Sequence, residues 1–221
     1  SELDPGGRCA FLTARGLWLA SQGRNDEAEA AYAQAVKEDS RCAEAYLRMA
    51  EIELERGEEY EAETMLSNAA RLLPDDHRAA LRLAEIYVAG NKPVWALRTL
   101  NRIFDKIADE SEMARWNYLM ALAALQMDDG AGALKYMDAM PRRERKNYRR
   151  YYFYRGVALS KQNMQMEARS AFNRYLNSGD DDAAFRKQAE ERIDLTYMKG
   201  GRPPIFAFKL ALITQYDSNV V

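Results

Sequence analysis

The sequence has little of what catalytic and metal sites are commonly built from. Among 221 residues there are one histidine, His77, and two cysteines, Cys9 and Cys42. A catalytic triad or a Cys–His pair would have to use His77, which follows two aspartates where a helix-capping or exposed histidine is expected. Metal-ligand spacing and a phosphate-binding glycine loop are both missing. We therefore expect a non-catalytic protein without a cofactor or a metal.

A basic excess and long apolar runs are also missing. The net charge of −2 and the sequence pI of about 5.7 argue against a general nucleic-acid binder. No run of about eighteen apolar residues predicts a membrane helix. Residues 1–8 contain Pro5 and two glycines, show no signal peptide, and are expected to form a flexible lead. The chain could be cytosolic, could have lost a leader, or could start within a longer protein.

Small and large residues recur at helical spacing along most of the chain. In residues 46–74, Tyr46 and Ala50 mark one amphipathic helix, Ala62 and Leu66 mark a second, and Pro74 ends it. Alanines equivalent to Ala62 follow one another at steps of 34, 34, 37 and 35 residues, at Ala28, Ala62, Ala96, Ala133 and Ala168. A small residue at such a position lets two helices cross closely, and a large residue four positions later fills the adjacent groove.

This pattern resembles the tetratricopeptide repeat over residues 9–178. The resemblance implies an all-α, right-handed superhelix, an α-solenoid of about five helical hairpins with a concave face lined by the first helix of each. Residues 182–199 are predicted to form a C-terminal capping helix, so that the solenoid occupies residues 9–199.

The two cysteines lie 33 residues apart, close to one repeat length. Equivalent positions of successive first helices are roughly 10 Å apart, too far for an unstrained disulfide. Free thiols are therefore the favoured interpretation, and a bridge is the alternative for a periplasmic protein.

The helical pattern ends at residues 200–204, and a period of two follows in residues 206–215. One strand of a membrane barrel has this alternation, and so does an extended arm packed on the capping helix. The run AFKLALITQYDSNV, residues 207–220, resembles the first strand of outer-membrane barrels that follow a tetratricopeptide domain. Surface-lipoprotein assembly modifiers and exopolysaccharide-export porins have this organisation. The resemblance implies that residues 200–221 are a linker and the first strand of a β-barrel.

The first-helix positions that face the groove in this architecture are rich in arginine and aromatic residues. Guanidinium groups interleaved with aromatics suit carboxylates of an extended peptide or an acidic glycan. Pairing of Arg78 and Arg82 with Glu44, Glu51 and Glu85 is the alternative, which we consider weaker for the two arginines further along the chain because few acids face them. The candidate ligand-binding residues are Arg48, Arg78, Arg82, Arg115, Tyr118, Arg150, Phe153 and Tyr154.

Two functions are compatible with this sequence. The first is the periplasmic domain of an outer-membrane export or secretion protein, a scaffold that engages a protein or peptide cargo, or an anionic polysaccharide, and passes it to a C-terminal barrel of the same polypeptide. The second is a cytosolic adaptor that binds an acidic peptide or a co-chaperone partner. Neither function requires nucleic acid.

Overall fold

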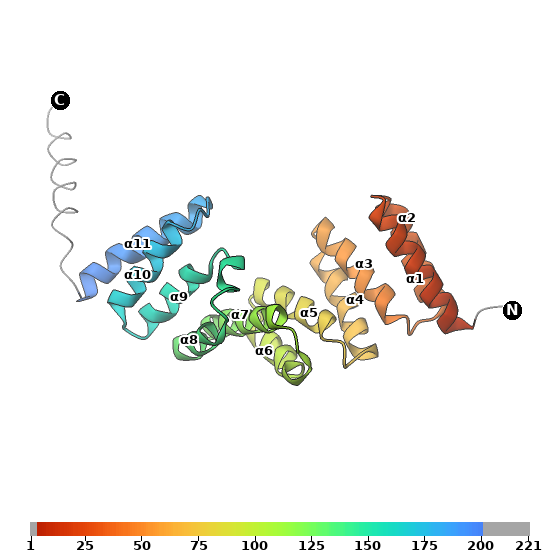
Figure 1. Cartoon of the computed structure of the whole chain (residues 1–221), viewed down its shortest axis with the longest axis horizontal. Helices are drawn as coiled ribbons and strands as arrows, with labels where there is room; N and C mark the ends of the chain where they lie inside the picture. Colours follow the sequence, from red (N-terminus) through yellow and green to blue (C-terminus); the bar gives the residue numbers. More distant parts are fainter. Residues whose placement is uncertain (1–3, 201–221) are drawn as a thin grey trace, which may run out of the picture. The chain divides into compact units, whose positions relative to one another are not determined.

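The computed structural model describes residues 4–200, and their side chains as far as Tyr197. These residues form α-helices and two short 3₁₀ helices and contain no strand (Figure 1). This confirms the predicted all-α chain of helical hairpins, whereas the strand expected within residues 206–220 lies outside the described residues. The helices are α1 Pro5–Ser21, α2 Asn25–Glu38, α3 Ala43–Arg56, α4 Glu59–Leu72, α5 His77–Ala89, α6 Pro93–Asn101, η1 Phe104–Lys106, α7 Glu110–Gln126, α8 Gly130–Ala139, η2 Arg145–Asn147, α9 Tyr151–Lys161, α10 Gln165–Leu176 and α11 Ala183–Gly200.

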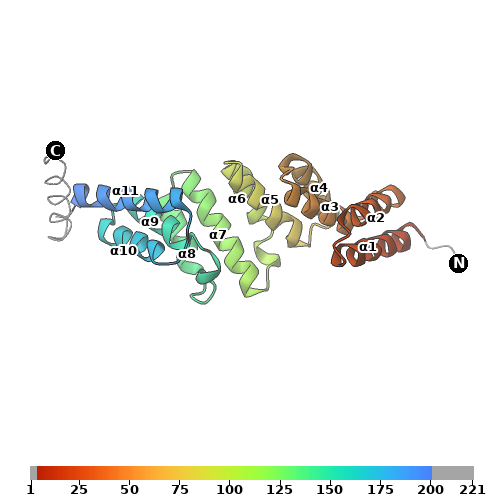
Figure 2. The same cartoon turned by 90° about the horizontal axis from the view of Figure 1, so that it is seen from above.

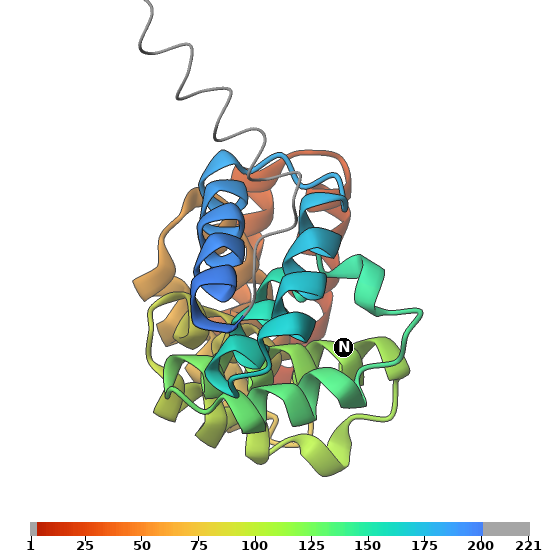
Figure 3. The ribbon, with the colours of Figure 1, turned by 90° about the vertical axis from the view of Figure 1, so that its left-hand side faces the viewer.

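The chain divides into two compact units, Ser1–Ala123 and Ala124–Val221, called unit 1 and unit 2 below. In unit 1, α1 packs on α2, α3 on α4 and α5 on α6, while α2 contacts α3 and α4 contacts α5 (Figure 2). Each hairpin therefore touches the next one along the chain. In unit 2, α9 packs on α8 and α10, and α11, drawn in blue, lies alongside α10 (Figure 3). The predicted capping helix is thus present as α11.

The periodic alanines are fully buried where each second helix packs in its hairpin. All five, at positions 28, 62, 96, 133 and 168, have no exposed surface. The large residue four positions later is also buried in every hairpin, as the sequence pattern predicts. These residues are Tyr32, Leu66, Leu100, Met137 and Phe172. Burial of each such side chain is worth roughly 1.5–3 kcal/mol relative to exposure. Each hairpin therefore contributes a small hydrophobic core of its own.

A second periodic feature, which the sequence analysis missed, sets the turn inside each hairpin. Five residues before each alanine, the backbone takes a left-handed conformation with φ between 53° and 82°. An L side chain other than Asn or Asp is costly in this conformation, so the position is restricted to residues that tolerate it. They are Gly23, Gly57, Asn91, Asp128 and Asn163.

Helix α1 begins inside the segment expected to be a flexible lead. Pro5 occupies the first helical turn, and the Asp4 carboxylate accepts a hydrogen bond from the Gly7 amide at 2.7 Å. Proline tolerates this position because the first amides of a helix have no intrahelical partner, and an N-cap aspartate satisfies one of them. The first helix therefore starts at Pro5, earlier than Cys9.

The prediction of free thiols is wrong. Cys9 and Cys42 form a disulfide, with Cα atoms 5.8 Å apart. The estimate of 10 Å assumed that both residues sit at equivalent points of α1 and α3. Cys42 instead forms the N-cap of α3, in the link from α2, so the spacing between helix axes does not set its distance from α1. The bridge ties the first hairpin to the second.

Candidate functional site

Four of the five predicted arginines lie in unit 1, on the first helices of consecutive hairpins. Arg48 is on α3, Arg78 and Arg82 are on α5, and Arg115 is on α7. Each has at least one carboxylate within ion-pair distance. We call these four arginines together with Glu44, Glu51, Asp76 and Glu85 the charge ladder.

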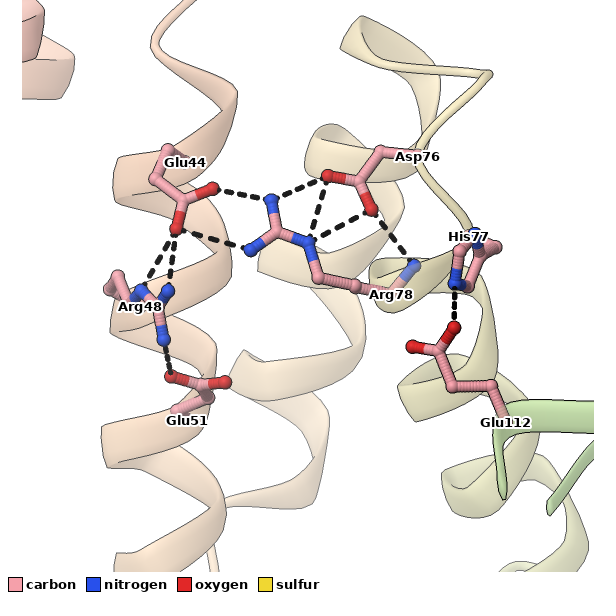
Figure 4. Close-up of polar contacts among 7 residues, drawn as sticks. All are labelled: Glu44, Arg48, Glu51, Asp76, His77, Arg78 and Glu112. Atoms are coloured by element: carbon pink, nitrogen blue, oxygen red, sulfur yellow. Dashed lines mark hydrogen bonds and ion pairs between the residues drawn. The ribbon is translucent and has the colours of Figure 1, made fainter. Parts of the chain in front are cut away.

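Glu44 is the junction of the ladder between α3 and α5 (Figure 4). Its Oε1 accepts hydrogen bonds from Arg48 Nε at 3.0 Å, one turn along the same helix. Its Oε2 accepts from Arg78 Nη2 of the next hairpin at 2.7 Å. Arg48 also donates to Glu51 at 2.9 Å, and Arg78 donates to Asp76 at 2.6 Å. Acidic and basic groups thus alternate from one hairpin to the next.

Glu85 has the corresponding role between α5 and α7. Arg115 donates through Nε to Glu85 Oε1 at 2.6 Å, and its Nη2 lies 2.6 Å from Glu85 Oε2. The planar guanidinium therefore faces both oxygens of the carboxylate, the geometry that such a fork favours. Arg82 donates to the same carboxylate from within α5 at 3.3 Å. The two arginines share one acid, which leaves Arg82 the more weakly held.

The ladder changes the electrostatics of its members. The hydrogen bond from the Arg78 guanidinium, against a smaller effect of burial, holds the pKa of Asp76 below its usual value. Burial acts to lower the pKa of Arg48, but the carboxylates of Glu51 and Glu44 outweigh it and raise that pKa. Both shifts reinforce the ordinary charge state of these two groups, the carboxylate of Asp76 and the guanidinium of Arg48.

The alternative interpretation, in which the arginines pair with neighbouring acids, is confirmed for Arg78 with Glu44 and for Arg82 with Glu85. The expectation that few acids face Arg115 and Arg150 is wrong. Glu85 reaches Arg115 because α5 and α7 bring together residues 30 positions apart. Asp182 reaches Arg150 over 32 positions. A pattern read within one helix could not reveal either contact.

The ladder nevertheless stays open to solvent. The exposed fraction of each ladder arginine's side chain is 27% for Arg48, 44% for Arg78, 41% for Arg82 and 28% for Arg115. A shallow hollow of about 290 Å³ lies beside it, lined by Glu51, Leu54, Glu55 and Arg82. Exposed pairs of this kind contribute about 0.2–1 kcal/mol each, so a ligand group can replace one partner at small cost. The arrangement can exchange partners but offers no group poised for catalysis.

The fifth arginine, Arg150, lies in unit 2 just before α9. Its Nη2 donates to Asp182 at 2.5 Å, its Nε lies 3.7 Å from Asp180, and its guanidinium stacks 3.8 Å from the ring centroid of Phe185. Asp182 also accepts from the Ala184 amide at the start of α11. Arg150 therefore joins α9 to the capping helix α11, which is a structural role.

The three aromatic candidates do not form one accessible surface. Phe153 is only 3% exposed and packs against Phe172, Tyr175 and Phe185 with ring centroids 4.9–5.9 Å apart. It belongs to the core of unit 2 and cannot touch a ligand. Tyr154 is half-buried beside Phe185, and burial raises the pKa of its hydroxyl. Tyr118 on α7 is half-buried in unit 1.

His77 is neither a helix cap nor an exposed residue. Asp76 supplies the N-cap of α5 by accepting from the Arg78 amide at 3.0 Å. His77 Nε2 instead lies 2.6 Å from Glu112 Oε2 of α7, and the imidazole is 19% exposed (Figure 4). This contact connects α5 of the third hairpin to α7, and it involves no nucleophilic side chain.

Two further observations concern residues 4–200. No group of three or more His, Cys, Asp or Glu side chains is placed to hold a metal ion in this part of the chain. None of its helices combines the length and the apolar character that crossing a bilayer requires.

Comparison with known proteins supports the tetratricopeptide-repeat fold. Residues 19–79, from the end of α1 to the start of α5, match the model of the tetratricopeptide repeat family. A search of curated protein sequences found no significant match.

Several solved structures have a similar fold at low sequence identity. YrrB, described as a TPR protein with an unusual peptide-binding site, is 18% identical, with a TM-score of 0.66 over 81% of this chain and 90% of that one. PilF of Pseudomonas aeruginosa is 16% identical, with a TM-score of 0.64 over 88% and 91%. The match to a chain of the APC/C hetero-tetramer Cut9–Hcn1 has 18% identity and a TM-score of 0.62 over 86% of this chain, which spans 36% of that chain. At these identities the likeness concerns the fold.

Proposed function

We propose that this protein is a non-catalytic scaffold that binds a protein or peptide partner along the charge ladder of unit 1. The observation that supports the proposal is the continuity of the ladder across three consecutive first helices, with every arginine paired and still partly exposed. A partner with both acidic and basic side chains can take over these pairs one by one. The tetratricopeptide-type fold favours the same conclusion, since repeat arrays commonly present an extended binding surface.

A protein partner fits the ladder better than an anionic polysaccharide. Glu44, Glu51 and Glu85 lie among the arginines, and Glu55 lines the adjacent hollow. A polymer of one negative sign would meet repulsion from these carboxylates. A peptide can instead alternate its charges to match them.

We further propose that the scaffold works in an oxidising compartment, the periplasm of a bacterial export system. The Cys9–Cys42 disulfide supports this placement over the cytosolic adaptor, because disulfides persist in secreted and periplasmic proteins and are rare in the cytosol. The accompanying proposal, that an outer-membrane barrel follows in the same polypeptide, rests on residues 207–220 alone. Fractionation of the native host tests both: we expect the protein in the outer-membrane fraction with no free thiol, and recovery from the cytosol with reduced cysteines contradicts the placement.

Site-directed photo-crosslinking tests the binding face. A photoreactive amino acid at Leu54, in the hollow beside the ladder, should capture a discrete partner in the native host. The same amino acid at Gln34, exposed on α2, is the positional control. The adduct at Leu54 should disappear when Arg82→Glu and Arg115→Glu are combined. Identical adducts at both positions, or an adduct that survives the double substitution, contradict binding at the ladder.

A further inference from the structure

A second groove in unit 1, larger than the hollow beside the ladder, is lined mainly by α4, α5 and α6. It has a volume of about 420 Å³, within the range of ligand-binding sites. Helices α4 and α6 form its walls, α5 lies between them, and the residues after α6 close one end. All of it belongs to unit 1.

The walls of this groove carry cations that have no anionic partner. Arg71 comes from α4, Arg98 from α6, and Arg102 from the residue that caps α6. All three side chains are exposed, and none forms an ion pair with a described residue, in contrast to every arginine of the charge ladder. The remaining base, Lys106, already donates to the Pro74 carbonyl and to Asp75. The lining acid, Asp76, is committed to Arg78.

The interior of the groove is apolar. Ala80 and Leu83 of α5 and Ile103 after α6 line it, with exposures of 6%, 5% and 3%. Trp95 stands at the edge with 55% of its surface exposed, and the Arg98 guanidinium lies 6.0 Å from the centroid of its ring. An exposed tryptophan beside unpaired arginines is the combination that dominates binding energy at protein interfaces. The groove therefore offers an apolar contact surrounded by three guanidinium groups that form no ion pair with a described residue.

We propose that this groove is a second binding site, which takes a peptide segment carrying carboxylates on either side of an apolar side chain. The apolar side chain would lie against Leu83, Ile103 and Trp95, and the carboxylates would pair with Arg71, Arg98 and Arg102. Guanidinium groups favour carboxylates because their donors match both oxygens. A nucleic acid is disfavoured, because the chain carries a net charge of −2 and Trp95 is the one exposed aromatic ring lining the groove.

Because Arg71, Arg98 and Arg102 have no anionic partner within the described residues, their effect on folding stability can be predicted. Like charges held on neighbouring helices repel each other, which costs folding stability, and a bound carboxylate removes that cost. Neutralising one of the three groove arginines should therefore leave the protein as stable as before or more stable, while it weakens binding of the acidic peptide. A residue retained only for structure would behave in the opposite way.

The test uses purified protein of residues 1–221 and fluorescein-labelled short peptides in which one leucine or phenylalanine is flanked by aspartate and glutamate. Fluorescence anisotropy should show saturable binding to the wild-type protein. The double variant Arg71→Glu/Arg98→Glu should weaken it by about tenfold or more, since the loss of even one charge-assisted hydrogen bond is worth about one decade. The matched control is Arg15→Glu/Arg41→Glu, which changes the net charge equally at exposed positions outside the groove. Binding should be unchanged in this control.

Three outcomes overturn the proposal. They are no saturable binding of any such peptide, equal loss of binding in the two double variants, or equally tight binding of a thymidine oligonucleotide that depends on Arg71 and Arg98. Thermal unfolding of Arg98→Gln provides a second measurement, with an unchanged or raised midpoint expected. The ladder variant Arg82→Glu/Arg115→Glu should bind the acidic peptide normally, so failure of the groove proposal and failure of the proposed function are distinguishable.

Discussion

Gly156 and Phe172 fit together because one has no side chain and the other has a large one. A Cβ atom placed on Gly156 would lie 2.6 Å from Cε1 of Phe172, well inside van der Waals contact. Gly16 and Tyr32 have the same relationship, at 2.3 Å. Where the large residue is instead aliphatic, as at Leu66, the first helix has alanine at the equivalent position, Ala50. Each hairpin thus matches a small residue to the size of the side chain across from it.

This relationship predicts that the effect of Gly156→Ala on the free energy of unfolding changes sign with the residue at position 172. In the wild-type protein, Gly156→Ala should destabilise, because overpacking costs about 1–3 kcal/mol and exceeds the gain in helix propensity. In a Phe172→Leu background the ring is gone, so the same substitution should stabilise by about 1 kcal/mol. Urea unfolding of the two single variants and the double variant measures this. Equal effects of Gly156→Ala in both backgrounds would mean that the two residues are not coupled.

The disulfide should be a major source of stability for the first two hairpins. Closing a loop of 33 residues is worth about 3–4 kcal/mol in the chain-entropy account. Cys9→Ala/Cys42→Ala should therefore lower the thermal midpoint, and reductant should lower the wild-type midpoint toward that of the variant. The variant itself should not respond to reductant. A wild-type midpoint unaffected by reductant, with two titratable thiols, would contradict the bridge.

The left-handed turn residues should tolerate glycine and be destabilised by alanine. At Gly57, with φ of 82°, Gly57→Ala should cost about 1–2 kcal/mol although no atom lies near the new methyl group. At Asn91, with φ of 53°, Asn91→Gly should be nearly neutral and Asn91→Ala should be destabilising. Chemical denaturation of the three variants separates backbone conformation from packing. A neutral Gly57→Ala would show that the turn relaxes.

The charge ladder should contribute to acid sensitivity. Arg78 keeps the pKa of Asp76 lower in the folded than in the unfolded chain. The stabilisation is therefore present above the unfolded pKa of about 3.9 and is lost as the pH falls through the folded value. Asp76→Asn retains an N-cap oxygen but removes the charge, so the stability difference from wild type should shrink as the pH is lowered below about 4.

The matched control for the pH experiment is Asp105→Asn. Asp105 is exposed, and no pairing partner is present among the described residues. Its stability difference from wild type should be small, because the substitution removes no ion pair with a described residue. A difference for Asp76→Asn that stays constant from neutral to acid pH would show that the charge of Asp76 does not matter to folding.

The hairpins follow from local spacing along the chain. Small residues such as Ala62 and Ala96 recur with the period of a helical unit, and that period is a local property, because residues three and four positions apart share a helix face wherever the helix lies. The turn residues Gly57 and Asn91 follow the same period, and the signal was visible in the sequence as Gly, Asn or Asp five positions before each alanine.

Which side chains pair across different helices depends on how the helices pack. Two examples are the ion pair of Arg115 with Glu85 and the disulfide of Cys9 with Cys42. Both depend on the distance between separate helices, which the spacing of residues along one helix does not specify. The groove arginines show the same dependence: nothing in the sequence distinguishes Arg71 and Arg98 from the paired arginines, yet neither forms an ion pair with a residue of the described part of the chain. Which side chains pair depends on the distance and orientation between helices, and helix packing determines both.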